Sequence, residues 1–387
     1  AYLEKNGKKR PLSGDPVTAA GKWVSGFKVK GEVKPFSNGI VGWLGYELVR
    51  FLETKIKTKE LGDEGVLMAF PAMVLISKKK VTLWTLRGDG KRLARRLEGV
   101  WRGLPKGEIR KAESVGAPEG TMGKSAFLNA VKRIKSHIRA GDIFQCVISE
   151  RFSVRNEESP IDLYRRLRAV SPSPYNFYFR DGEKSYLGAS PEMLVKVEGG
   201  LVETCPIAGT RPRGKGAHDK RLEKALLASP KERAEHLMLV DLGRNDLGKV
   251  CAPGTVEVSS FMKVRRFSHV MHLVSTVEGR IEKGKTAWDA LKACFPAGTV
   301  SGAPKVRAME IISELETTPR GFYSGAFLQH DFQGNLDSCI ALRSVQKKGG
   351  RAVFRAGAGI VADSRPEAEY QEVRNKLAAA RKALGAA

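Results

Sequence analysis

The order of strand-like and helix-like segments along this chain is irregular, and this constrains the fold more than any other feature of the sequence. Runs typical of strands lie at residues 143–152, 175–179, 186–205, 339–348 and 351–362, and residues 1 to about 115 hold further short strand-like runs. Helical patterns separate some of these runs but not others. A parallel sheet needs a helical crossover between successive strands, so the pattern predicts an α+β fold with large antiparallel sheets.

A stretch rich in proline and glycine, residues 104–123, has the composition of a linker. Directly after it, Phe127, Val131, Ile134 and Ile138 recur at helical spacing, which predicts an amphipathic helix over residues 124–140. We therefore expect two parts, a β-rich N-terminal region at 1–118 and a catalytic domain at 119–387.

Charge and cysteine usage exclude several classes of protein. The five cysteines are scattered and never form a CxxC pair, which indicates neither a disulfide framework nor a zinc site and favours a reducing cytoplasm. No apolar run approaches the roughly 20 residues that span a bilayer, so no membrane association is expected. The net charge of +25 is spread along the chain rather than gathered in one arm, so we expect no nucleic-acid partner and instead steering of small anions.

Two stretches have the pattern of a capped helix start. Ser229 to Glu232 places a serine before a proline, with a glutamate three residues after the serine, which is the pattern of a capping box. This assigns the Glu232 side chain to the cap and puts Glu235 on a face with Leu239. Residues 364–367 repeat the pattern and predict a second helix with a serine cap.

The second predicted helix presents Glu369, Glu372 and Lys376 on one stripe. Such a stripe is ordinarily a solvated helix face. Alternatively, Mg²⁺ needs only one or two protein carboxylates and leaves its other positions to water and an anionic substrate. Glu235 and Glu372 would suffice for this, with Glu369 close by.

Three glycine-containing stretches could bind an anion through backbone amides. Residues 298–304 precede a helix predicted to begin near Pro304, residues 356–359 would form a nest between two strand-like runs, and residues 207–211 form a third small-residue turn. Glycine turns are mostly just turns, but three of them beside a metal site favour a ligand with more than one carboxylate.

Five long motifs occur in order: PIAGTRPRG, ERAEHLMLVDLGRNDLGKV, FSHVMHLVSTVEG, FPAGTVSGAPKVRAMEII and AGAGIVADSRPEAEY. On these motifs the chain resembles the chorismate-utilising enzymes from about Gly123 to Ala380, and GWLGYELVR at residues 42–50 is similar to the family's N-terminal half. The resemblance implies that family's fold, in which large antiparallel sheets pack as a sandwich with helices on the outside.

The family includes isochorismate, salicylate, aminodeoxychorismate and anthranilate synthases, and two positions separate them. The members that use water carry a lysine base where this chain has Gln145, which cannot take a proton from water. Aminodeoxychorismate synthases typically carry a lysine that attacks the ring, where this chain has Ala208. Direct addition of ammonia remains, which is the reaction of component I of the anthranilate synthases in tryptophan biosynthesis.

The resemblance also implies roles for individual residues. Mg²⁺, held by Glu235 and Glu372 with Glu369 nearby, would bind the ring carboxylate of chorismate. Glu192 would protonate the leaving C4 hydroxyl, and His272 would serve the elimination of pyruvate. The other catalytic positions are Gln145 and Thr299, and the expected substrate contacts are Gly209, Thr210, Tyr323, Arg343, Gly357, Ala358, Gly359 and Lys376.

No cysteine lies in a Gly-x-Cys-x-Gly elbow, so we expect a separate glutamine amidotransferase subunit to supply the ammonia. Two alternatives stay open. One is the aminodeoxychorismate synthase reaction of the folate pathway, and the other is a non-catalytic basic binding protein on the same scaffold.

Overall fold

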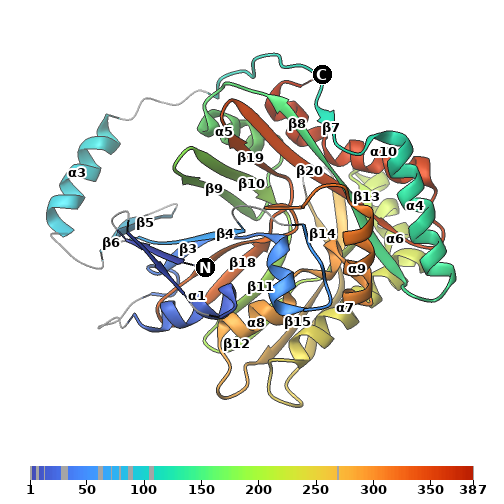
Figure 1. The fold of residues 1–387 in the computed structure, drawn as a ribbon, viewed down its shortest axis with the longest axis horizontal. Helices are drawn as coiled ribbons and strands as arrows, with labels where there is room; N and C mark the ends of the chain where they lie inside the picture. The colour runs from blue at the N-terminus through green and yellow to red at the C-terminus, as the bar shows by residue number, and fades with distance from the viewer. Residues whose placement is uncertain are drawn as a thin grey trace.

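The computed structural model describes residues 2–5, 8–12, 14–27, 34–59, 64–70, 72–77, 80–85, 90–103, 109–267 and 270–386. Two large antiparallel sheets dominate this part of the chain (Figure 1). The first sheet is ordered β16-β8-β20-β19-β10-β9, with β7 paired to β8, and its strands are β7 Glu119–Gly120, β8 Gln145–Arg155, β9 Tyr175–Asp181, β10 Lys184–Ser190, β16 Gly302–Ala303, β19 Ser344–Lys348 and β20 Arg351–Ile360.

The second sheet is ordered β13-β15-β12-β11-β18-β17-β3-β4, with β14 paired to β15. Its strands are β3 Ile40–Leu44, β4 Gly65–Ala69, β11 Met193–Glu198, β12 Leu201–Thr204, β13 Ile207–Pro212, β14 Glu257–Arg266, β15 Val270–Arg280, β17 Ala326–His330 and β18 Leu336–Ile340. The predicted strand at 339–348 is therefore two strands in different sheets, and the run at 186–205 holds three strands.

Two small hairpins and the helices complete the described elements. The hairpin strands are β1 Tyr2–Lys5, β2 Lys8–Pro11, β5 Ala72–Ile76 and β6 Val81–Thr85. The helices are α1 Pro16–Ser25, η1 Tyr46–Leu48, α2 Val49–Leu52, α3 Gly90–Arg102, α4 Gly123–Arg139, α5 Pro160–Val170, α6 Ala217–Ala228, α7 Pro230–Gly248, α8 Ala287–Cys294, η2 Gly298–Val300, α9 Lys305–Leu315, α10 Pro366–Lys376 and α11 Ala378–Leu384. The α+β class is confirmed, as is the helix predicted at 124–140.

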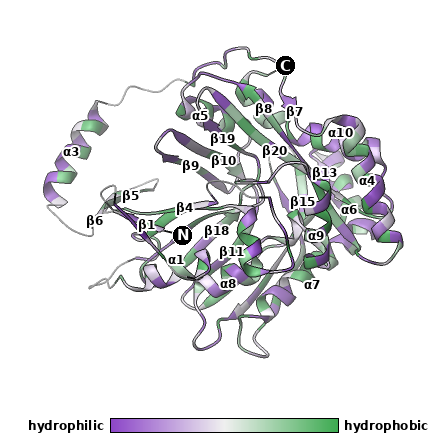
Figure 2. Cartoon of the chain, in the orientation of Figure 1, coloured by the Kyte–Doolittle hydropathy of each residue, from purple (hydrophilic) through white to green (hydrophobic). Residues whose placement is uncertain are grey.

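The two sheets pack face to face through buried apolar side chains, as the sandwich prediction requires. Phe177 and Tyr186 from the first sheet share one core cluster with Trp43 and Cys339 from the second, and the ring of Phe177 stacks on that of Phe327 in β17. Strands such as β8 and β10 are buried on both faces, because the second sheet covers one face of the first sheet and helices cover the other. Helices α4 and α10 cover the outer face of β8 and β20 and carry hydrophilic as well as hydrophobic residues (Figure 2).

The N-terminal segment contributes directly to the second sheet. Strand β3 pairs with β17 from Ile40 opposite His330 to Leu44 opposite Ala326. The ring of Trp43 in β3 packs on Tyr186 of the first sheet, with 4.5 Å between ring centroids. The division of the chain at residue 118 stays a prediction, but the second sheet contains strands from both sides of this residue. Among the described residues, no helix is both long and apolar enough to cross a membrane.

Candidate active site

A cavity of about 510 Å³ opens between strands β8, β13, β15 and β20 and helices α7 and α10. It is lined by all but one of the residues that the sequence nominated: Gln145, Glu192, Gly209, Thr210, Glu235, His272, Thr299, Tyr323, Arg343, Gly357, Gly359, Glu369, Glu372 and Lys376. Residues from 145 to 376 thus converge on one site, which is large enough for a small organic ligand.

Ala358 is the exception. Its side chain is fully buried in a core cluster that also contains Val373 of α10. Gly357 and Gly359, its neighbours in β20, line the cavity. Successive residues of a strand face opposite sides, so the methyl group of Ala358 points away from the site.

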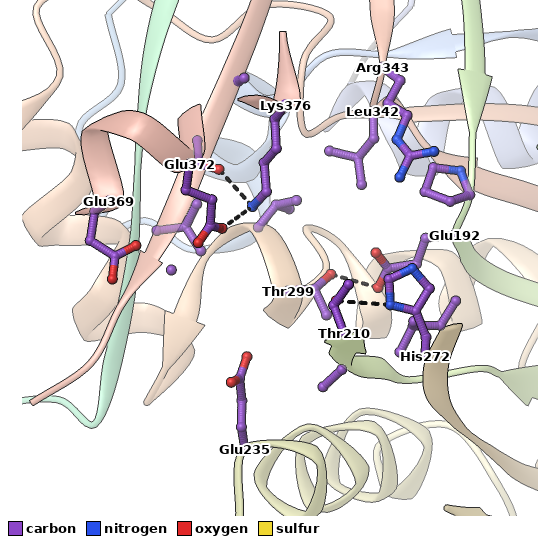
Figure 3. Close-up of a pocket in the computed structure, with 18 of the residues that line it drawn as sticks. Glu192, Thr210, Glu235, His272, Thr299, Leu342, Arg343, Glu369, Glu372 and Lys376 are labelled. Carbon is purple, nitrogen blue, oxygen red and sulfur yellow. Dashed lines mark hydrogen bonds and ion pairs between the residues drawn. The ribbon is translucent and has the colours of Figure 1, made fainter. Parts of the chain in front are cut away.

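Glu192 lies in the short turn between β10 and β11 and is the most deeply buried acid of the cavity, with 9% of its surface exposed. The hydroxyl of Thr299 donates a 2.8 Å hydrogen bond to its Oε1 atom (Figure 3). Burial raises the pKa of the Glu192 carboxyl to about 7, against the opposing effects of Thr299, Lys376 and Arg343. A carboxyl group with this pKa can donate a proton near neutral pH.

His272 lies on β15 directly opposite Thr210 on β13. Its Nδ1 atom is 3.0 Å from the carbonyl oxygen of Gly209 and 3.0 Å from the hydroxyl oxygen of Thr210. A carbonyl only accepts, so Nδ1 carries the proton and the lone pair of Nε2 is free. Burial lowers the pKa of His272, and the charge of Arg343 acts in the same direction. The ring is therefore a neutral proton acceptor at neutral pH.

The predicted turn at residues 207–211 is instead a bulged part of β13. The register with β15 shifts between Ala208 and Thr210, and Gly209 between them has a φ of +72°. An extra residue in one strand re-aims its neighbours, and glycine adopts the left-handed conformation without strain. The bulge turns the Gly209 carbonyl toward His272 instead of forming an anion nest.

The three predicted metal ligands approach the cavity from two helices. Glu235 projects from α7, and Glu369 and Glu372 project from α10 toward the same space (Figure 3). Burial raises the pKa of Glu235, and the charges of Glu232 and Glu372 raise it further. Burial also raises the pKa of Glu369, again with a contribution from Glu372. Excess negative charge thus faces the cavity from both helices.

These carboxylates do not meet at one point. Among the described residues, no three His, Cys, Asp or Glu side chains are arranged to hold a metal ion by themselves. Glu372 instead pairs with Nζ of Lys376 at 2.7 Å, and the same Nζ donates to the carbonyl oxygen of Gly357 at 3.0 Å. The donor set still fits Mg²⁺, which accepts oxygen ligands from one or two carboxylates and takes the rest from water or substrate.

The predicted helix caps are half right. Ser229 caps α7 by accepting a hydrogen bond from the backbone N–H of Glu232. The Glu232 side chain is not committed to the cap, because its carboxylate pairs with Arg211 at 2.7 Å and lines the cavity. At the second helix the prediction was wrong: Arg365 is the N-cap of α10, and the Ser364 hydroxyl accepts from the backbone N–H of Val361 instead.

The predicted nest at residues 356–359 is also wrong, because β20 runs without interruption from Arg351 to Ile360 and pairs with β8 throughout. Its other neighbour, β19, pairs with it only as far as Phe354. Beyond that point the edge of β20 has no strand partner among the described residues. The Gly357 carbonyl on this edge accepts from Lys376, and the N–H of the same residue points the same way. The stretch therefore offers backbone groups to the cavity as a free strand edge.

The glycine-rich stretch before α9 contributes differently from the prediction. Helix α9 does begin after Pro304, but Gly302 and Ala303 pair with β8, and the cavity is reached only by Thr299 and Val300. The function of this stretch is thus to position the Thr299 hydroxyl rather than to present free amides.

Arg343 and Gln145 have features typical of functional positions. Arg343 has a φ of +46°, a conformation that costs a non-glycine residue energy and is over-represented at functional sites. Gln145 is buried, and its Oε1 atom has no hydrogen-bond partner in the protein. A ligand in the cavity would supply the missing donor.

Three charged residues of the cavity were missed from the sequence: Lys231, Glu232 and Arg355. Glu232 lies three residues before Glu235, a spacing that places both on one helix face, so the helical period could have identified it. Lys231 lies four residues before Glu235, so the same period could have identified it. Arg355 carries no such signal, since it becomes part of the cavity only through the packing of distant elements.

The chain matches a family model described as chorismate binding enzyme over residues 7–382. The anthranilate synthase component 1 of Acetivibrio thermocellus is 45% identical over 98% of this chain and 82% of its own length. That of Streptomyces coelicolor is 46% identical over 97% of this chain and 80% of its own length. The solved structure of anthranilate synthase component I from Streptococcus pneumoniae superposes with a TM-score of 0.87 and 36% identity, covering 98% of this chain and 89% of that one. This chain belongs to the family of chorismate-binding enzymes.

Proposed function

We propose that this chain catalyses the reaction of anthranilate synthase component 1, in which chorismate and ammonia give anthranilate and pyruvate. The similarity to enzymes of that name extends over nearly the whole chain. One structural observation carries the proposal. The cavity holds a carboxyl group with a pKa near 7, Glu192, and a neutral imidazole, His272, and the reaction needs one acid and one base.

In the first step ammonia forms a bond to C2 of the ring while the bond from C4 to its hydroxyl group breaks. Glu192 donates its proton to the departing hydroxyl, which leaves as water. Thr299 holds the carboxyl group toward the substrate through its hydrogen bond to Oε1. Gln145 contributes no base, so water is not activated as a competing nucleophile.

In the second step the proton on C2 is removed and the bond from C3 to the enolpyruvyl oxygen breaks, so the ring becomes aromatic. The departing enolpyruvate takes up a proton and becomes pyruvate. The free lone pair of Nε2 makes His272 the base for this step, because Nδ1 is held by the Gly209 carbonyl. The positive charge of Arg343 beside His272 suits the enolpyruvyl carboxylate, to which a guanidinium can bind in a bidentate manner.

We propose Mg²⁺ as the cofactor, held by Glu235 and Glu372 with Glu369 beside them. When bound, it would fix the ring carboxylate and stabilise negative charge developing on the substrate. Lys376 and the free edge of β20 at Gly357 and Gly359 would contact the same carboxylate. Burial, with a smaller contribution from the charge of Glu372, raises the pKa of Glu235 and of Glu369, and a cation between the two helices would favour their charged forms.

We also propose a glutamine amidotransferase subunit as the source of ammonia, and the cytoplasm as the compartment. All five cysteines are buried and unpaired, as is usual in a reducing compartment, and none is placed as a glutaminase nucleophile. The rival aminodeoxychorismate reaction is disfavoured because Ala208 lines the cavity without an amine that could attack the ring.

One assay tests the proposal. The purified chain is incubated with chorismate, MgCl₂ and ammonium chloride at pH 8.5, and anthranilate fluorescence and released pyruvate are recorded. We expect both products in equal amounts and a loss of both on addition of EDTA. An aminated product that keeps its enolpyruvyl group, or no reaction with any nitrogen donor, would reject the assignment.

A further inference from the structure

A second cavity, of about 40 Å³, adjoins the proposed active site. Glu192, Leu239 and Thr299 line both cavities, whereas Thr204, Asp246 and Ala297 line only the smaller one. Thr204 and Ala297 are half-buried, so the small cavity reaches toward the surface. Glu192 and Thr299 thus stand between the substrate site and a separate opening.

The lining of the small cavity is suited to water. The hydroxyl of Thr299 donates to Glu192, and that of Thr204 donates to the carbonyl oxygen of Leu194 at 3.0 Å. Both oxygens therefore keep lone pairs that can accept from water. A carboxylate, Asp246, supplies a third acceptor. A water molecule needs roughly 10–15 Å³ of such volume and two to four polar partners, so the cavity has room for about three.

Asp246 is a buried charged residue in the lining of this cavity. It is 5% exposed and pairs with Nζ of Lys305 at 2.6 Å and with Nζ of Lys249 at 3.3 Å. The Lys249 side chain is itself more than half exposed. Two acidic groups thus line the cavity: Glu192, which also lines the substrate site, and Asp246, which pairs with solvent-exposed Lys249.

The proposed reaction requires proton traffic at Glu192 while chorismate fills the large cavity. Amination converts neutral ammonia into a ring-bound ammonium group, and it converts the C4 hydroxyl into water with the proton of Glu192. One proton must then pass from the new ammonium group to water, and one must return from water to the Glu192 carboxylate. Chorismate in the large cavity would lie between Glu192 and the solvent on that side.

We propose that the small cavity is a water-filled passage through which Glu192 regains its proton from solvent during turnover, an inference that rests on the function proposed above. The charged groups that influence Glu192 are Arg343 and Lys376, and both belong to the substrate side. The passage reaches the Glu192 carboxyl group from the other side. Among the described residues, Asp246 is the charged residue that lines the passage besides Glu192 itself.

Filling the passage tests this inference. Ala297→Leu places a larger apolar side chain in the small cavity without touching the large one. We expect kcat to fall at least about fivefold, with an increased solvent deuterium isotope effect and unchanged KM values for chorismate and ammonia. Ala293→Leu, which lines neither cavity, is the matched control and should retain the wild-type isotope effect. Thr204→Val removes a water acceptor without adding bulk, and it should raise the isotope effect even if Ala297→Leu fails to fold.

The isotope effects and KM values of these variants distinguish a water passage from the alternatives. An isotope effect that stays at the wild-type value in folded Ala297→Leu and in Thr204→Val would overturn the passage. A rise confined to the KM for ammonia would also overturn it, because the cavity would then carry the nucleophile. A wild-type chain that makes no anthranilate would instead reject the proposed function, so the two failures are distinguishable.

Discussion

The Nδ1 atom of His272 lies 3.0 Å from the carbonyl oxygen of Gly209, in a bulge that the sequence showed only as a small-residue turn. This contact fixes the tautomer of the ring and leaves Nε2 to face the substrate. Under the proposed function, this arrangement suits His272 to the elimination step, while amination would depend on other groups.

His272→Met should therefore separate the two steps. We expect chorismate consumption to continue while the aminated, non-aromatic intermediate accumulates, because the base that removes the C2 proton is absent. Chromatography of the products with detection by mass would show this. Normal anthranilate output from the variant would contradict the role, and Thr210→Val is a useful comparison because it removes only the second contact of Nδ1.

Glu235→Gln should abolish Mg²⁺-dependent turnover and leave the fold intact, because the amide removes a charged ligand from a half-buried position. Anthranilate fluorescence against MgCl₂ concentration measures the first effect, and circular dichroism the second. Asp241→Asn on the same helix is the control, since its side chain is half exposed and pairs with Arg244. Equal loss of activity in both variants would remove the metal assignment.

The pH dependence of kcat should reveal Glu192. The pKa of this group is raised to about 7, and the protonated form is the active one, so activity is present below pH 7 and falls as pH rises above it. The fall should approach tenfold per pH unit, provided that free ammonia is kept saturating at every pH. Glu192→Gln should lower kcat by about 10²–10⁴-fold and abolish this limb. A limb that persists in the variant would assign it to another group.

A buried charge network beside the cavity should dominate stability. Glu316 accepts from Nη2 of Arg320 at 2.7 Å and from Nη2 of Arg355 at 3.1 Å, and all three side chains are at most 4% exposed. Glu316→Gln leaves two guanidinium groups unpaired and should cost about 3–5 kcal/mol of unfolding free energy. Denaturant titration measures this. Glu157→Gln, which breaks the exposed pair with Arg155, should stay within about 0.5 kcal/mol of wild type.

Local sequence signals predicted the helices of the site well and its strands less well. The serine and proline at 229 and 230 gave the true start of α7, because a cap is formed by adjacent residues. The same pattern predicted a serine cap at Ser364 wrongly, because the Ser364 hydroxyl accepts from the backbone N–H of Val361 and not from the first turn of α10. Residues 356–359 look like a turn from composition, yet pairing with the distant β8 holds them extended.

The roles of Gln145 and Ala208 could be read only against a known family, because an isolated glutamine or alanine has no characteristic chemistry. Arg355 shows the opposite limit. It lines the cavity only because β20 lies beside β8 and the end of α9, an arrangement set by long-range packing. The sequence therefore identified most of the polar side chains that line the cavity, whereas their contacts with one another could be described only from the fold.

The pairing of β3 with β17 bears on how this enzyme can be handled. A fragment that begins after residue 118 would lack β3. The backbone amides and carbonyls of β17 that pair with β3 would then form an exposed, unpaired strand edge. We expect copies of such a fragment to aggregate through pairing of these exposed edges. Anyone dissecting the enzyme by gene truncation should accordingly keep residues 40–44 attached.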